Sequence, residues 1–125
     1  MQGLLSNLNK MAYDEFLAER VRRTLSQHNV PFEEKHMMGG VCYMVDDKMC
    51  LGVVKQSLMA RIDPEFTEKA LEKPGCRLMD FTGKTMKGFV FVDPEGTDLD
   101  KDLDYWVELG LAFNPKAKSS KKKKG

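Results

Sequence analysis

Apolar residues in the first quarter of the chain follow a helical period. Between residues 11 and 29 they recur at steps of three and four, which predicts an amphipathic helix. The apolar positions are Tyr13, Phe16, Leu17, Val21 and Leu25. Asn29 and Pro31 predict the end of this helix, because a proline does not continue one.

After the helix, short apolar runs alternate with turn residues, which is the pattern of strands. The runs cover residues 41–45, 49–54, 58–62 and 88–93. Residues 32–38, where the helical period ends, form a further predicted strand, with a shorter extended piece at 77–81. The Asp46-Asp47 pair separates two of these runs and predicts a β-hairpin over residues 41–54. Gly39-Gly40 predicts a turn or bulge, since glycine readily adopts a positive φ.

Two further helices are predicted from capping residues and period. Asp63 followed by Pro64 is typical of a helix start and predicts a short helix over residues 65–73. Thr97 or Asp98 caps a final helix that runs to about Asn114. The apolar face of the final helix consists of Leu99, Leu103, Trp106, Val107 and Phe113.

This order of elements predicts an α+β fold. We expect a two-layer sandwich in which helices flank a mainly antiparallel sheet of about five strands, because the strands are joined by short turns. Both faces of the predicted hairpin are apolar: Val41, Tyr43 and Val45 lie on one, and Cys42 and Met44 on the other. Either helices cover both faces, or one face binds a partner, most simply a second copy in a homodimer.

The charges divide the chain into an acidic body and a basic tail. The 125 residues contain 20 Lys and Arg and 19 Asp and Glu, a net charge of +1. Six of the lysines and no acid fall within residues 116–125, so the other residues carry a net charge of −5. We therefore predict a flexible or helical extension at residues 1–10, a folded domain at residues 11–114 and a disordered Lys-rich tail at residues 115–125.

The acidic body argues against a strongly basic nucleic-acid-binding domain. Lysines in the tail are able to contact phosphates weakly and without sequence preference, and Lys121, Lys122, Lys123 and Lys124 are the candidates. No aromatic residue lies between these lysines, so the tail offers no platform on which bases would stack.

The sequence predicts a cytoplasmic protein with no membrane partner. No apolar run reaches the roughly 18 residues of a membrane-spanning helix. The first ten residues lack the basic segment and the long apolar stretch of a secretory signal. Three cysteines are an odd number, which favours free thiols in a reducing compartment.

Two short patterns are similar to ligand-binding motifs but lack required residues at the positions that those motifs prescribe. Gly83-Lys84-Thr85 matches the end of a phosphate-binding loop, yet Leu78 stands where that loop requires its first glycine. The alternating aspartates of residues 98–104 imitate a calcium loop, but leucines occupy the positions of the required Gly and Glu. A β-turn and the first turns of a helix explain these patterns.

His36, Cys42 and Cys50 are the candidate residues for a metal site or a nucleophilic centre. They lack the paired spacing of zinc motifs. A two-residue turn at Asp46-Asp47 places the two cysteines on opposite faces of the hairpin, whereas a three-residue loop places them on the same face. We therefore assign no catalytic residue, no metal ligand and no cofactor.

Three segments occur in an order that is typical of a known family. They are Met37-Met38-Gly39-Gly40, the apolar hairpin of residues 41–54 and Met86-Lys87-Gly88-Phe89-Val90. Over about residues 12–113 the chain resembles the TfoX N-terminal-domain family, named for a bacterial regulator of natural competence. Met38 stands where the family usually has Phe. The resemblance implies a two-layer sandwich similar to that of secretion chaperones, and it carries over no catalytic residue.

The first functional hypothesis is a non-enzymatic regulatory or interaction module, acting in transcription or competence regulation. Its binding residues would be Met37, Met38, Gly39 and Gly40, because glycines permit close approach and methionine offers an adaptable apolar contact. The alternatives are a small enzyme or ligand- or metal-binding protein that uses His36 with Cys42 or Cys50, and a chaperone-like peptide binder.

Overall fold

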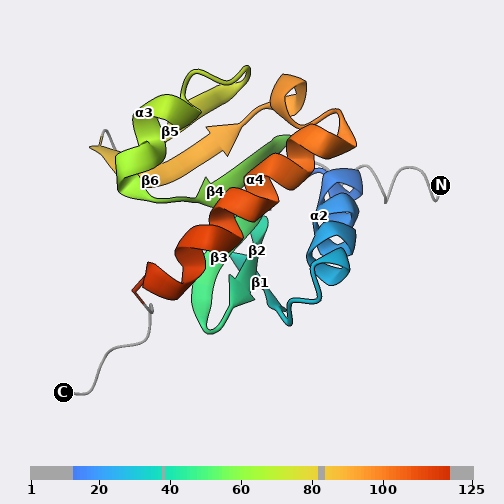
Figure 1. The fold of residues 1–125 in the computed structure, drawn as a ribbon. Helices are drawn as coiled ribbons and strands as arrows, with labels where there is room; N and C mark the ends of the chain where they lie inside the picture. The colour runs from blue at the N-terminus through green and yellow to red at the C-terminus, as the bar shows by residue number, and fades with distance from the viewer. Residues whose placement is uncertain (1–12, 38, 82–83, 119–125) are drawn as a thin grey trace.

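One antiparallel sheet forms the centre of the computed structural model, which describes residues 13–37, 39–81 and 84–118 (Figure 1). The strands are β1 (Glu33–Met37), β2 (Gly40–Val45), β3 (Lys48–Val54), β4 (Ser57–Arg61), β5 (Cys76–Phe81) and β6 (Lys84–Val92). The helices are α2 (Glu15–Gln27), α3 (Thr67–Ala70) and α4 (Asp100–Phe113), with 3₁₀ turns at Pro64–Phe66, Pro94–Gly96 and Asn114–Lys116.

The sheet has six strands in the order β1-β2-β3-β4-β6-β5, and every neighbouring pair is antiparallel. The predicted α+β class is therefore confirmed, although the sheet has six strands rather than about five. The extended piece at residues 77–81 is part of the full strand β5, and β6 begins at Lys84 rather than Gly88. Polar residues interrupt the apolar pattern there, but Asp80 pairs with Thr85 through the backbone.

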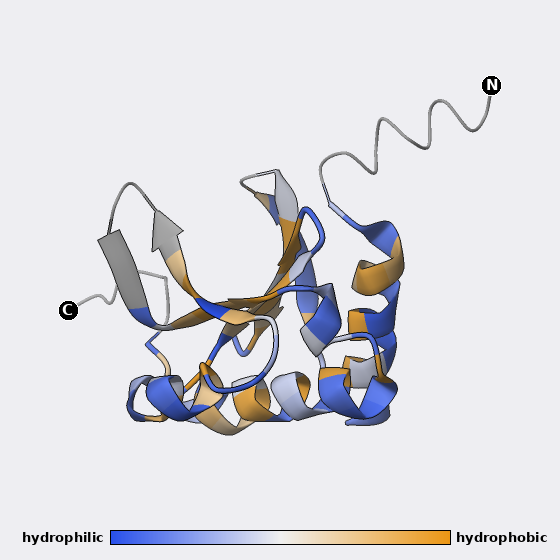
Figure 2. Cartoon of the chain, turned by 90° about the horizontal axis from the view of Figure 1, so that it is seen from above, coloured by the Kyte–Doolittle hydropathy of each residue, from blue (hydrophilic) through white to orange (hydrophobic). Residues whose placement is uncertain are grey.

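Helices α2 and α4 lie on the same side of the sheet (Figure 2). Between the helices and the sheet, Tyr43 of β2 and Trp106 of α4 are almost completely buried in the main core. The Tyr43 hydroxyl donates a hydrogen bond to the Ala18 carbonyl oxygen of α2 at 3.1 Å, and the Trp106 indole donates to the Gly96 carbonyl at 3.2 Å. These two bonds satisfy the polar atoms of the largest core side chains, so their rings can be buried.

The first helix is shorter than predicted. Asp14 is its N-cap and accepts hydrogen bonds from the Phe16 and Leu17 amides, so α2 begins at Glu15. Tyr13 lies outside the helix and forms a β-bridge with Lys55. Phe16, predicted to be apolar core, is 68% exposed because the first turn presents it away from the sheet.

The final helix also begins later than predicted. Leu99 is the N-cap of α4 rather than a member of its apolar face, and it is 57% exposed. The predicted cap at Asp63 is confirmed: its side chain accepts from the Glu65 amide ahead of a 3₁₀ turn and the short α3.

The segment after α4 packs against the sheet. The Asn114 amide donates to the Val45 carbonyl at 3.1 Å, Ala117 is buried, and Arg61 donates to the Lys118 carbonyl at 3.3 Å. Residues 115–118, assigned to the tail from sequence, therefore contact the domain. Residues 1–10 and 119–125 lie outside the described part of the chain. Within the described ranges, no helix has the length and apolar character needed to cross a membrane.

The two glycines between β1 and β2 serve different needs. Gly39 has a φ of +74°, and no atom lies within 4 Å of a Cβ built there. At Gly40 a Cβ would overlap the carbonyl oxygen of Val53 on β3. Gly39 therefore permits the turn, whereas Gly40 permits the close approach of two strands.

We expect Gly40→Ala to lower the free energy of unfolding by about 2 kcal/mol, as is typical of overpacking, because its Cβ has no space beside Val53. Gly39→Asn is the matched control. Asn tolerates a positive φ and meets no neighbour there, so we expect a loss of less than about 1 kcal/mol. Urea unfolding monitored by circular dichroism measures both values. A loss at Gly39→Asn as large as that at Gly40→Ala would contradict these roles.

Candidate functional site: the methionine face

The side of the sheet opposite α2 and α4 carries a second apolar cluster and no described helix (Figure 2). We call it the methionine face. Its centre is buried and its surrounding side chains are partly buried. The centre consists of Cys42, Met44, Met59 and Met79, and the surround of Met37, Met49, Phe89 and Phe91.

Strand register explains how these residues meet. Directly opposed residues of antiparallel strands present their side chains on the same face. One row therefore crosses the whole sheet on this side, with cations at both ends and sulfur and aromatic groups between them. From β1 to β5 the row is Lys35, Cys42, Gly52, Met59, Phe91 and Arg77.

The packing of the centre depends on a glycine in the middle of that row. A Cβ built on Gly52 would lie 3.0 Å from the methyl carbon of Met59, so the Met59 methyl occupies the space that a side chain would need. The thiol of Cys42 lies 3.7 Å from the sulfur of Met44. Sulfur and methyl groups thus fill this cluster, and methionine adapts its shape to its neighbours more easily than branched residues do.

Two arginines lie over the aromatic rings of the face. The guanidinium carbon of Arg61 is 5.2 Å from the centroid of Phe89, and that of Arg77 is 5.0 Å from the centroid of Phe91. Both are cation–π distances. Arg77 also forms an ion pair with Asp93 at 3.0 Å, and this hydrogen bond holds the pKa of Asp93 below its ordinary value. The arginines cover the rings and contribute positive charges to the rim of the face.

Burial disfavours ionisation of all three thiols, of which only Cys42 belongs to the methionine face. Burial raises the pKa of Cys42 from 9.0 to about 11, although the charge of Lys35 opposes part of the shift. Burial raises the pKa of Cys50 to about 12 and that of Cys76 to about 11. Thiolates are the nucleophiles and the metal ligands, so these cysteines behave as apolar side chains near neutral pH.

The structure does not bring His36 together with either cysteine. Cys42 belongs to the methionine face and Cys50 to the main core, so the two-residue turn places them on opposite faces, as its geometry predicted. His36 opposes Val41 of the main core, is exposed, and has its ring 6.1 Å from that of Tyr13. The alternative that joined His36 with Cys42 or Cys50 is therefore corrected, because strand alternation and distance along the sheet keep the groups apart.

The predicted binding segment lies at one edge of the methionine face. Met37 packs against the cluster, and Gly39 and Gly40 form the adjoining turn. Met38 lies outside the described residues, as do Lys121, Lys122, Lys123 and Lys124. The tail's contact with nucleic acid and the chaperone-like peptide binding therefore stay predictions.

The sequence pattern alone does not predict that most of these residues share one face of the sheet. The alternation in residues 88–93 does contain the signal, since Phe89 and Phe91 share one parity and Val90 and Val92 the other. Met59 and Met79 stand in runs that are apolar at almost every position, so which face each one joins depends on strand pairing.

A family model described as the TfoX N-terminal domain matches residues 24–114, more than half of the chain. This range includes all six strands, and so every residue of the methionine face, together with the whole of α4. No curated protein and no solved structure matches the chain, so the likeness to secretion chaperones stays an expectation.

We expect Cys42 and Cys50 to react slowly with iodoacetamide in the native chain at pH 8, because only about one Cys42 thiol in a thousand is ionised three units below its pKa. Since the folded pKa is raised, the rate should increase about tenfold per pH unit as the pH rises toward 10. Mass spectrometry of tryptic peptides identifies each labelled cysteine.

The control is the same reaction in denaturant, where all three cysteines should label quickly. Complete labelling of native Cys42 at pH 8, as fast as in denaturant, would contradict its burial in the cluster.

Proposed function

The chain belongs to the TfoX N-terminal domain family, and from this premise we propose that it is a non-enzymatic regulatory module that binds protein through the methionine face. The observation that supports the proposal is the composition of that face, which has five methionines, a thiol and two phenylalanines held by strands. Surfaces rich in methionine adapt to a partner, as binding modules require.

The properties of the three thiols and of His36 support the proposal that the chain is not an enzyme. The three thiols have raised pKa values, and the His36 side chain makes no hydrogen bond with any described residue. A catalytic thiol needs the opposite, a lowered pKa and a base within reach. A module that binds a partner without catalysing a reaction can act as a regulator. Family membership alone supports the further proposal that this chain acts in transcription or competence regulation.

The partner that we propose is a second copy of the chain. The rim of the methionine face carries both signs of charge: Glu33 opposes Met44, Lys35 opposes Cys42, and Arg61 lies over Phe89. A two-fold symmetric contact brings a surface against itself, so mixed charges allow Glu33 of one copy to face Lys35 or Arg61 of the other. The outer strand β1 is exposed and carries Glu33, Glu34 and Lys35, a composition that discourages pairing edge to edge.

We expect light scattering to show a mass that rises from 14.2 kDa toward twice that value as the concentration of the chain increases. Met49→Lys should hold the mass at the monomer value, because a charge in the partly buried surround of the face cannot be buried without a partner.

Phe16→Lys is the matched control, since Phe16 is an exposed apolar residue on α2, away from the methionine face. It should associate like the unaltered chain, and circular dichroism confirms that both variants fold. A chain that stays monomeric at every concentration, or a mass that falls equally in both variants, would overturn self-association through this face.

A further inference from the structure

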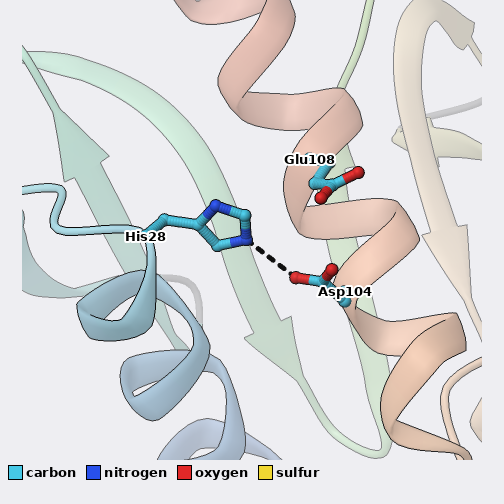
Figure 3. A group of neighbouring side chains, drawn as sticks. All are labelled: His28, Asp104 and Glu108. Carbon is cyan, nitrogen blue, oxygen red and sulfur yellow. Dashed lines mark hydrogen bonds and ion pairs between the residues drawn. The ribbon is translucent and has the colours of Figure 1, made fainter.

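We infer that His28, Asp104 and Glu108 form a binding site for a divalent transition-metal ion such as Zn²⁺. The ligand atoms of these three side chains lie within 4.8 Å of one another. Figure 3 shows the His28 ring at the end of α2 facing α4, where the carboxylates of Asp104 and Glu108 lie one turn apart. This site is separate from the methionine face, since both helices lie on the other side of the sheet.

The fold creates the site by packing the end of one helix against the middle of another. His28 is the C-cap of α2, and Asn29 then turns the chain away with a φ of 58°. Asp104 and Glu108 are four residues apart on α4, so they share one face of that helix. The His28 Nε2 atom lies 2.7 Å from an Asp104 carboxylate oxygen, and Glu108 has no hydrogen-bond or ion-pair partner among the described residues.

The donor set decides which metal would bind. One imidazole and two carboxylates suit zinc and neighbouring transition metals, whereas calcium and magnesium prefer oxygen ligands alone. Two carboxylates also balance the charge of a divalent ion. Zinc holds imidazole nitrogen and carboxylate oxygen at about 2.0–2.2 Å, so binding would insert the ion between Nε2 and the carboxylates. Part-exposed side chains can make this small movement, and water would fill the remaining position.

The end of α2 favours a cation at this place. The C-terminus of a helix carries partial negative charge, and the last turn of α2 contains no basic residue to balance it. Arg20, Arg23 and Lys101 line a neighbouring cavity of about 310 Å³ with Asp104. The first two are already paired, Arg20 with Asp100 and Arg23 with Glu19. Their charge therefore opposes a bound cation only in part.

The test is titration of the full chain with Zn²⁺ in a calorimeter. We expect one ion per chain at this site, and at least a tenfold loss of affinity in each of His28→Gln and Glu108→Gln. Asp102→Asn is the matched control, an acid on the same helix but outside the group, and it should bind as the unaltered chain does. Circular dichroism confirms that the variants fold.

Titration with Co²⁺ separates this site from the cysteines. Co²⁺ at an imidazole and carboxylate site gives no thiolate-to-metal charge-transfer band, so the spectrum should lack one. A strong charge-transfer band, no detectable binding of Zn²⁺, or binding that is equal in the unaltered chain and in His28→Gln would each overturn the proposal.

Discussion

Both faces of the central sheet are apolar, but the helices formed by the described residues lie on only one of them, and the rest of the structure depends on this asymmetry. On the helix side, Tyr43 of β2 and Trp106 of α4 are buried in the main core, and each donates its hydrogen bond to a backbone carbonyl. Burial of large side chains there contributes most of the stabilisation, at roughly 1.5–3 kcal/mol for each fully buried aliphatic or aromatic group. The helices are thereby held on one side.

On the side without a described helix, the apolar side chains of the strands limit their own contact with water. Among them are unbranched, sulfur-containing side chains, with the Met59 methyl above Gly52 and the Cys42 thiol against Met44. Arg61 and Arg77 lie over the phenylalanine rings at its rim. Methionine side chains can change shape against a partner, which is the property on which the proposed binding role rests. The same burial raises the pKa of Cys42, so its thiol is mostly protonated near neutral pH.

The sequence predicts where the helices and strands lie better than it predicts which of their residues face the core. The Asp63 cap, the Asp46-Asp47 turn and the antiparallel order follow from local chemistry, and the structure agrees with them. Phe16 and Leu99 fit a helical period, yet both are exposed. α2 begins at Glu15 rather than near residue 11, which leaves Phe16 in its first turn, and Leu99 is the N-cap of α4 rather than part of the helix.

The sites are harder to predict than the elements because they depend on contacts between distant segments. The spacing of Asp104 and Glu108 is visible in the sequence, but their approach to His28 joins residues 76 positions apart. Likewise Met59 meets Gly52 and Phe91 only through the pairing of three strands.

NMR of the full chain with ¹³C-labelled methionine methyl groups, recorded at increasing concentration, tests directly whether the methionine face is the binding surface. We expect the signals of Met37, Met44, Met49, Met59 and Met79 to shift together, while the amide signals of α2 stay in place. Methionine signals that do not move, or shifts that are confined to α2 and its neighbours, would contradict the claim that the methionine face is the binding surface.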